Sequence, residues 1–156
     1  YTFAKFYSPN DNAIISLKFL ANSINSLAGD DVRISKRLFL PNKRLKGFEY
    51  GKIGPKDGSD YVGGNYATSF NFATTLPSLF TNLENFDFSL FVDAGNVWGV
   101  DYSDLISENS KIRSSTGLAI DWYTPIGPLS FSVSQPITKA DTDKTETFRL
   151  DIGTTF

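Results

Sequence analysis

The stretch GLAIDWYTPIGPLSFSVSQ, residues 117–135, decides the fold class because it holds two alternating runs on either side of a turn. Apolar residues occupy every second position of both runs, and small or polar residues lie between them. Period-two alternation predicts β-strands with one apolar face. The Pro and Gly of TPIGP, residues 124–128, predict a tight turn and therefore an antiparallel hairpin. The apolar positions are Leu118, Ile120, Trp122, Leu129, Phe131 and Val133.

The same alternation recurs along the chain and predicts an all-β protein of about seven antiparallel strands, with slight helical content. Residues 16–29 also fit a short amphipathic helix by the spacing of their apolar residues. The β-formers Ile14, Ile15 and Phe19 favour a strand there. The runs that carry the pattern lie at 1–8, 15–19, 66–72, 85–92, 111–123, 129–135 and 148–156.

The connections between these runs alternate between short and long. In a meander this alternation places the short turns at one end of the sheet and the long loops at the other, as in outer-membrane barrels. The apolar faces would then meet lipid, and the small polar faces a wet lumen. A soluble sandwich has to bury its apolar faces against each other and gives no reason for the loop asymmetry. The short connections are 8–12, 74–85 and 124–128, and the long ones are 26–65, 96–110 and 138–146.

The composition excludes most catalytic chemistry. The 156 residues contain no Cys, His or Met, which excludes disulfides, thiol chemistry, Cys/His metal sites and an imidazole base. We therefore expect no enzyme, no catalytic residue, no metal and no cofactor. The net charge of −2 gives no reason to expect a nucleic-acid partner. The chain opens on an alternating aromatic run, YTFAKFYSPN, which predicts a fragment of a longer protein.

Several segments in order resemble the BamA family of outer-membrane assembly factors. RLFLPNKRLKGFEYGKIGP at 37–55 contains a loop tetrapeptide, here Leu45, Lys46, Gly47 and Phe48, and is followed by the GGN of YVGGN. The resemblance covers residues 30–156 and, more loosely, 1–29. The other matching segments are FVDAGNVW (91–98), GLAIDWYTPIGPLSFSVSQPI (117–137) and FRLDIGTTF (148–156).

The resemblance implies a transmembrane β-barrel of roughly sixteen strands in the outer membrane of a Gram-negative bacterium. Residues 1–156 would be its C-terminal part, incomplete as a barrel, with 27–65 a long loop inserted in the lumen. The periplasmic POTRA domains would lie outside this chain. The family inserts other barrels without chemical catalysis, so its implied partners are the lipid bilayer, client barrels and accessory assembly lipoproteins. An isolated fragment would have open strand edges through which it could self-associate.

The family also implies roles for particular residues. Its loop tetrapeptide carries an arginine that pairs with acids of the lumen wall; here Lys46 takes that position, Asp93 matches one acid, and Asn71 takes the position of a second. Lysine lacks the planar fork of arginine and asparagine lacks charge, so a weaker pairing is expected. The alternative is that the loop's basic residues form a solvated surface. These basic residues are Lys36, Arg37, Lys43, Arg44 and Lys46.

The end of the chain resembles the terminal signal by which outer-membrane proteins are recognised for assembly. Such a signal would present a β-edge with alternate side chains for selectivity. The alternative is an amphipathic strand that happens to end in an aromatic residue. The residues of the expected signal are Phe148, Leu150, Ile152 and Phe156.

The charged residues of the strands give a further expectation, and the function keeps alternatives. The acids Asp87, Asp93, Asp121 and Asp151 are expected in the lumen, paired with Arg113 and Arg149. Besides an insertase, the sequence leaves open a two-partner secretion transporter or passive pore, and a soluble all-β binding module. Dependence on detergent separates the soluble module from the others. The presence and number of POTRA domains in the full-length protein separate the insertase from the transporter or pore.

Overall fold

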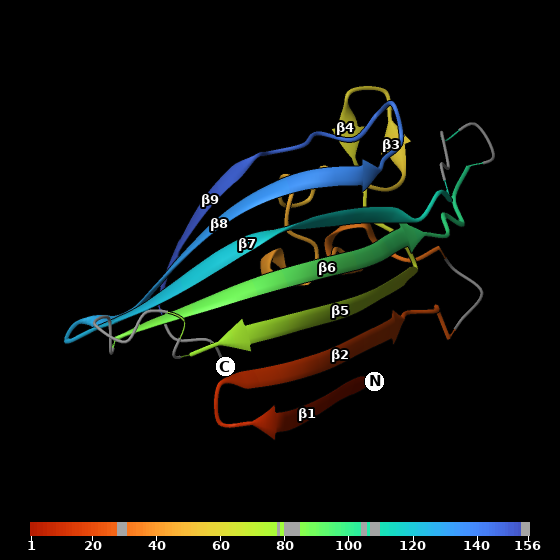
Figure 1. Ribbon diagram of the computed structural model, residues 1–156. Coiled ribbons are helices and arrows are strands. Elements are labelled where there is room, and N and C mark those ends of the chain that lie inside the picture. The colour runs from red at the N-terminus through yellow and green to blue at the C-terminus, as the bar shows by residue number, and fades with distance from the viewer. Residues whose placement is uncertain (28–30, 78, 80–84, 104–105, 107–109, 154–156) are drawn as a thin grey trace.

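A computed structural model describes residues 1–156 apart from 28–30, 78, 80–84, 104–105, 107–109 and 154–156 (Figure 1). Seven antiparallel strands form one sheet in the order β1-β2-β5-β6-β7-β8-β9. Two strands form a separate hairpin, and none of the described helices is long and apolar enough to cross a membrane. The sheet strands are β1 (Thr2–Asn10), β2 (Ala13–Ser23), β5 (Tyr66–Leu76), β6 (Phe86–Trp98), β7 (Arg113–Thr124), β8 (Gly127–Thr138) and β9 (Phe148–Ile152). The hairpin strands are β3 (Lys56–Asp57) and β4 (Asp60–Tyr61), and the 3₁₀ turns are η1 (Ile34–Lys36) and η2 (Asn42–Arg44).

The predicted all-β sheet is confirmed, and so is its incompleteness as a barrel. The sheet ends on β1 and β9, which do not pair with each other, so it stays open at both edges. Residues 13–23 form strand β2. The strand that the β-formers favoured is therefore confirmed over the alternative of a short helix. Figure 1 shows the short connections at one end of the strands and the long ones at the other.

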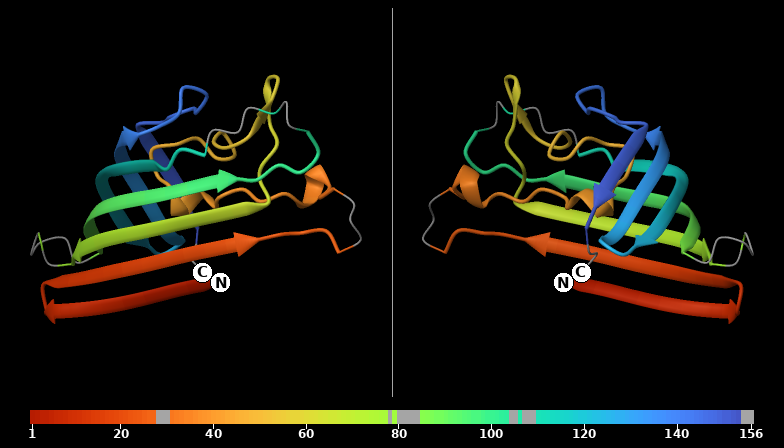
Figure 2. Two further views of the ribbon diagram at one scale, coloured as in Figure 1. Left: turned by 90° about the vertical axis from the view of Figure 1, so that its right-hand side faces the viewer. Right: turned by 90° about the vertical axis from the view of Figure 1, so that its left-hand side faces the viewer.

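The two faces of the sheet differ in the way that the alternation predicts. The concave face carries small and polar residues that are buried, and the outer face carries exposed apolar residues. Figure 2 shows the sheet curving around the chain that leaves β2. Buried polar residues on the concave face are Ser69, Asn71, Asp93, Ser115, Ser132, Ser134 and Arg149. Exposed apolar residues outside are Phe70, Leu90, Val92, Leu118, Val133, Phe148 and Leu150.

The hydrophobic core lies between the concave face and the long connection 24–65, not between two sheets. Four of its members, Leu40, Leu45, Phe48 and Ile53, belong to that connection. The remaining three, Leu20, Ala67 and Val97, come from β2, β5 and β6. Burial of the connection therefore depends on the curvature of the sheet.

Stacked aromatic pairs lie at both ends of the strands. Tyr66 and Trp98 stack with ring centroids 5.7 Å apart near the long loops, and Phe86 and Trp122 stack at 5.4 Å near the short turns. Both pairs join directly opposed residues of neighbouring strands. Amphipathic aromatic rings favour the interface between lipid and water, so the pairs mark the two limits of the apolar band.

This arrangement predicts opposite tolerance to charge at adjacent positions of β7. Leu118 lies on the outer face opposite Leu90 and Val133, and Ala119 lines the lumenal side. In the full-length protein in bilayers, Leu118→Arg should lower the free energy of unfolding by about 2–4 kcal/mol, because an arginine near mid-membrane is poorly solvated. Ala119→Arg is the matched control and should cost much less. Equal losses in denaturant titrations would contradict the assignment of the two faces.

Candidate functional site

The described part of the long connection, residues 31–65, which we call the lumen loop, folds back onto the concave face of the sheet. Its two arms pair through reciprocal backbone hydrogen bonds between Leu38 and Gly64, of 2.8 and 3.0 Å. Between these arms, the 3₁₀ turn η2 leads directly into the tetrapeptide 45–48. The tetrapeptide is thereby placed against the middle of the wall formed by β6, β7 and β8.

Gly47 allows the tetrapeptide to approach β7 and β8 of the wall closely. Its φ of 88° lies in the left-handed region that favours glycine. A Cβ atom at this position would lie 3.1 Å from the Cβ of Ser115 and 3.2 Å from that of Ser134. A residue with a Cβ atom would therefore strain the backbone and crowd both serines.

Asp93 of β6 receives the main polar contacts of the tetrapeptide. Its Oδ2 lies 2.8 Å from Nζ of Lys46 and accepts a hydrogen bond of 3.1 Å from the Lys46 backbone N–H. Its Oδ1 accepts a hydrogen bond of 2.8 Å from the side-chain amide of Asn71. The Asp93 side chain is only 1% exposed and that of Lys46 20% exposed, so the ion pair is largely shielded from water.

Further contacts hold the same turn. The Asn71 amide also donates to the carbonyl of Arg44 at 2.8 Å, and the Ser115 hydroxyl donates to the carbonyl of Lys46. Nζ of Lys46 lies 4.1 Å from the centre of the Phe91 ring, a cation–π distance. Asn71 therefore contacts both the loop and Asp93, and the structure brings Lys46, Asp93 and Asn71 together.

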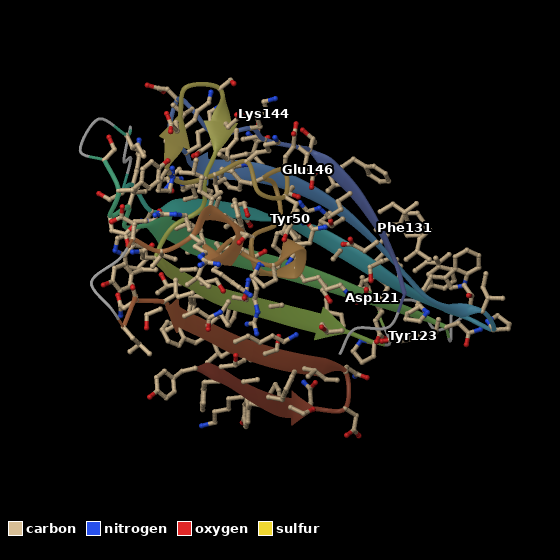
Figure 3. All side chains as sticks on the ribbon, turned by 180° about the vertical axis from the view of Figure 1, so that it is seen from behind. Tyr50, Asp121, Tyr123, Phe131, Lys144 and Glu146 are labelled. Atoms are coloured by element: carbon tan, nitrogen blue, oxygen red, sulfur yellow. The ribbon has the colours of Figure 1, made fainter. Side chains whose placement is uncertain are left out.

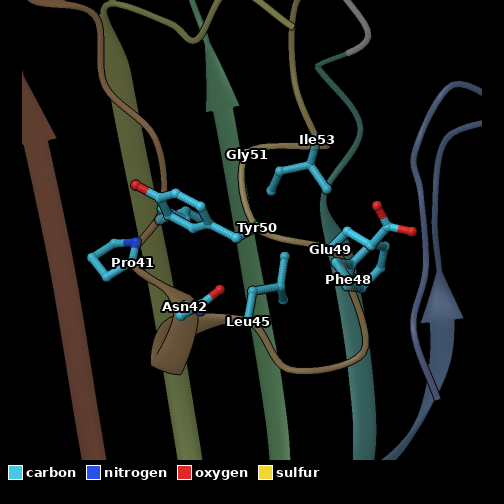
Figure 4. Close-up of a pocket in the computed structure, with 9 residues that line it drawn as sticks. Pro41, Asn42, Leu45, Phe48, Glu49, Tyr50, Gly51 and Ile53 are labelled. Atoms are coloured by element: carbon cyan, nitrogen blue, oxygen red, sulfur yellow. The ribbon is translucent and has the colours of Figure 1, made fainter. Parts of the chain in front are cut away.

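The apolar residues of the tetrapeptide point into the core of the lumen loop. Leu45 and Phe48 are 4% and 2% exposed. They pack near Leu40 and Ile53 around a cavity of only ≈ 10 Å³ (Figure 4). A space of that size holds about one water molecule, so it is a packing void and not a ligand site.

Arg149 of β9 holds the opposite side of the tetrapeptide. Its Nη1 and Nη2 donate to the carbonyls of Asn42 and Phe48, both at 2.5 Å, and its guanidinium pairs with Glu146. The segment before β9 also pairs with the loop through its backbone, beginning at an antiparallel bridge between Phe48 and Thr145. Figure 3 labels Lys144 and Glu146 of this segment and Tyr50 of the loop.

The expected partners of the arginines are different in the structure. Arg113 is fully buried and forms a two-fold ion pair with Asp143, with both distances 2.9 Å. Asp143 and Glu146 come from the 139–147 connection, which carries no alternating pattern that could have indicated them. Of the four expected acids, Asp93 pairs with Lys46, Asp87 accepts from the Tyr123 hydroxyl at 3.0 Å, and Asp121 accepts from the Ser130 hydroxyl.

Asp101, in the connection after β6, binds both arms of the lumen loop through hydrogen bonds. It accepts hydrogen bonds from the Val32 backbone N–H at 3.0 Å, from Asn65 at 2.9 Å and from Arg37 at 2.5 Å. Partial burial alone would raise the pKa of Asp101, but these hydrogen bonds outweigh it and lower the pKa to about 2. Sequence reasoning missed this residue because it lies outside any periodic run.

A polar cavity of ≈ 190 Å³ lies on the concave face below the tetrapeptide. Its charged lining residues are Lys18, Lys43, Lys46, Asp121 and Asp151. Within the part of the chain that the structure describes, no group of three or more acidic residues is arranged to hold a metal ion. The cavity is therefore a charged part of the concave face.

The terminal strand presents its expected apolar residues outward. Phe148 is 58%, Leu150 46% and Ile152 77% exposed. They lie opposite Val133, Phe131 and Leu129 of β8. Phe156 lies outside the described residues.

A curved, open antiparallel sheet with an apolar exterior and a loop docked on its polar interior defines the wall of a transmembrane β-barrel. The model of the Omp85 superfamily domain matches residues 1–156, and the chain belongs to that superfamily. Among curated proteins, the chain is 30% identical to the outer membrane protein assembly factor BamA of Neisseria meningitidis, over 72% of this chain and 17% of that protein. It is 27% identical to BamA of Neorickettsia risticii over 94% of this chain and 20% of that protein.

A eukaryotic relative and a solved structure agree with this assignment. The chain is 29% identical to a SAM50-like protein of Schizosaccharomyces pombe, over 83% of this chain and 28% of that protein. The crystal structure of BamA from Haemophilus ducreyi lacking POTRA domains 1–3 matches with a TM-score of 0.84 and 30% identity, over 96% of this chain and 33% of that one. The chain is thus a BamA-like C-terminal barrel segment, located in the outer membrane of a Gram-negative bacterium. It spans a third or less of each of these relatives.

The contact between Lys46 and Asp93 predicts a measurable coupling. In the full-length protein, Asp93→Lys should increase protease cleavage within 37–65, and the paired change Lys46→Asp should partly restore resistance. Because Asp93 is shielded, the coupling should exceed the roughly 0.2–1 kcal/mol of a solvated ion pair. Asp87→Lys, on the same strand and face, is the control and should leave 37–65 resistant. Additive effects of the two changes would mean that Lys46 and Asp93 do not stabilise each other.

The hydrogen bonds of Asp101 predict a loss of loop attachment in acid. A carboxyl whose pKa is lowered on folding contributes stability that is present above its unfolded pKa of about 4 and lost as pH falls through about 2. Hydrogen–deuterium exchange of the peptide containing Val32, corrected for intrinsic rates, should show full protection at pH 5 and a loss between about pH 4 and pH 2. Asp101→Asn should remove this pH dependence. An identical pH profile in both proteins would contradict the role of Asp101.

Proposed function

We propose that this chain is the C-terminal wall of an outer-membrane insertase, which folds and inserts β-barrel proteins by pairing strand edges at its seam. The single observation that carries the proposal is the terminal strand. β9 has only 5 residues, whereas its neighbour β8 has 12, and β9 ends the sheet formed by the described residues. A short edge strand offers unpaired backbone donors and acceptors to an incoming strand.

The relatives support the same function. Two are described as outer membrane protein assembly factors and one as SAM50-like. Insertion by strand pairing needs no covalent step, so the proposal includes no catalytic residue and no cofactor. Its partners are the lipid bilayer, client barrels and, in the complete protein, accessory assembly lipoproteins.

The lumen loop supports an insertase over a passive pore. A pore needs an open lumen, whereas here residues 31–65 pack on the concave face and bury Leu45 and Phe48 there. In this proposal the ion pair between Lys46 and Asp93 keeps the loop docked, together with the hydrogen bonds that Asn71 donates to Asp93 and to the Arg44 carbonyl. A two-partner secretion transporter remains the second candidate, because such proteins share the loop tetrapeptide.

The test follows a client strand during insertion. The full-length protein, in a cysteine-free background, carries a photoreactive probe on Leu150→Cys of β9 or on Leu118→Cys of β7. Both positions face outward, but β7 already has a neighbour on each side. An unfolded client barrel added to proteoliposomes should crosslink to position 150 and not to 118, because β9 ends the sheet whereas β7 lies inside it.

The outcomes separate the candidates. Faster client folding with crosslinks at position 150 supports the insertase. Equal crosslinking at both positions would show contact through lipid and not through a strand edge. Absence of accelerated folding, together with passage of a secreted substrate, would favour the transporter.

A further inference from the structure

We propose that Arg149 is a positioning residue that couples the lumen loop to the terminal strand, so that the docked loop holds β9 in the sheet. The coupling concerns the barrel itself and is measured without a client. Its consequence for insertion rests on the proposed function.

β9 pairs with its neighbour β8 over only a short length. β8 contains 12 residues and β9 only 5, and their register runs only from Leu129–Ile152 to Val133–Phe148. Two more backbone hydrogen bonds extend this pairing: the Ser134 N–H donates to the Thr147 carbonyl at 2.8 Å, and the Gly153 N–H donates to the Pro128 carbonyl at 3.1 Å. Among the described residues, the pairing of this segment with β8 begins at Thr147.

The chain leaving β8 pairs with the lumen loop. The Glu49 N–H donates to the Lys144 carbonyl at 3.0 Å, and the Lys144 N–H donates to the Lys52 carbonyl at 3.1 Å. The Glu146 N–H donates to the carbonyl of Gly47 at 3.1 Å. The residues that lead into β9 therefore take the loop as their partner in place of a strand.

The Arg149 guanidinium reaches from β9 to both ends of the turn that contains the tetrapeptide. It donates to the carbonyl of Asn42 before the tetrapeptide and to that of Phe48 at its end. Arg149 is only 7% exposed, and a guanidinium stays protonated at any accessible pH. Moving β9 out of the sheet would therefore break the charge-assisted hydrogen bonds to the carbonyls of Asn42 and Phe48.

These contacts form a continuous connection from the wall to the terminal strand. Asp93 holds Lys46, Gly47 follows directly in the chain, and Arg149 holds the carbonyl of Phe48. The loop is thus fixed to β6 on one side and to β9 on the other. Release at either side should loosen the other, which a purely local role of Arg149 does not require.

The test is a double-mutant cycle read out at β9 in the full-length protein in bilayers. Hydrogen–deuterium exchange of residues 148–152 reports opening of the strand. Arg149→Gln should accelerate this exchange about tenfold, as expected for the loss of charge-assisted hydrogen bonds. Asp93→Asn, which breaks the distant anchor, should also accelerate it.

The decisive result is the combination of the two changes. If Arg149 carries the coupling, Asp93→Asn has no further effect on residues 148–152 in the Arg149→Gln background. Arg149→Lys should restore part of the coupling, because one ammonium can reach one of the two carbonyls. Additive accelerations would overturn the proposal and leave Arg149 a local stabiliser.

Two further variants keep the test decisive. Asp151→Asn, on the same strand and lumenal face, is the control and should leave exchange of the loop residues 44–50 unchanged. A disulfide between Glu49→Cys and Lys144→Cys, which lie opposite each other next to the Phe48–Thr145 bridge, replaces the lost tie covalently. In the Arg149→Gln protein this disulfide should return β9 to slow exchange; fast exchange despite the disulfide would overturn the proposal.

Discussion

The docking of the lumen loop depends on the contacts of the Asp93 carboxylate with Lys46 and Asn71. This carboxylate lies fully buried on the concave face and accepts hydrogen bonds from the wall and from both the backbone and side chain of Lys46. An unpaired carboxylate at this depth would be strongly destabilising. Lys46 of the loop therefore supplies the hydrogen bonds and the charge that the buried carboxylate of Asp93 needs. Docking of the tetrapeptide also places Leu45 and Phe48 in the hydrophobic core.

The sequence predicted the parts of the fold that depend on periodicity. Strands with alternating residues, such as 86–92 and 117–135, could be placed because a one-residue slip would turn every apolar side chain into the lumen. The resemblance of the tetrapeptide to the family directed attention to Lys46, Asp93 and Asn71. Asp101, Asp143 and Glu146 could not be predicted, because connections have no period and their partners are fixed only when the sheet curves.

The different side chains on the two faces of the sheet explain why the loop contacts the concave face. On the outer face, apolar side chains meet lipid and give no directional contact to a loop. On the concave face, serine hydroxyls and glycine allow the backbone of 45–48 to approach, as the Cβ–Cβ limits at Ser115 and Ser134 demonstrate. Small residues in the lumen thus serve close packing of the loop as well as wetness.

The resemblance to the family implies an arginine and a second acid where this chain has Lys46 and Asn71, and we propose that these two departures compensate each other. An arginine can satisfy two carboxylates through its fork, whereas the ammonium of Lys46 is a point charge and would leave a second buried acid underpaired. Asn71 removes that second charge and uses its amide to donate to Asp93 and to the carbonyl of Arg44. One cation then faces one anion, and the amide supplies the contacts that the arginine fork would have made. On this argument Asn71→Asp should undock the loop unless Lys46→Arg accompanies it, and protease sensitivity within 37–65 measures both outcomes.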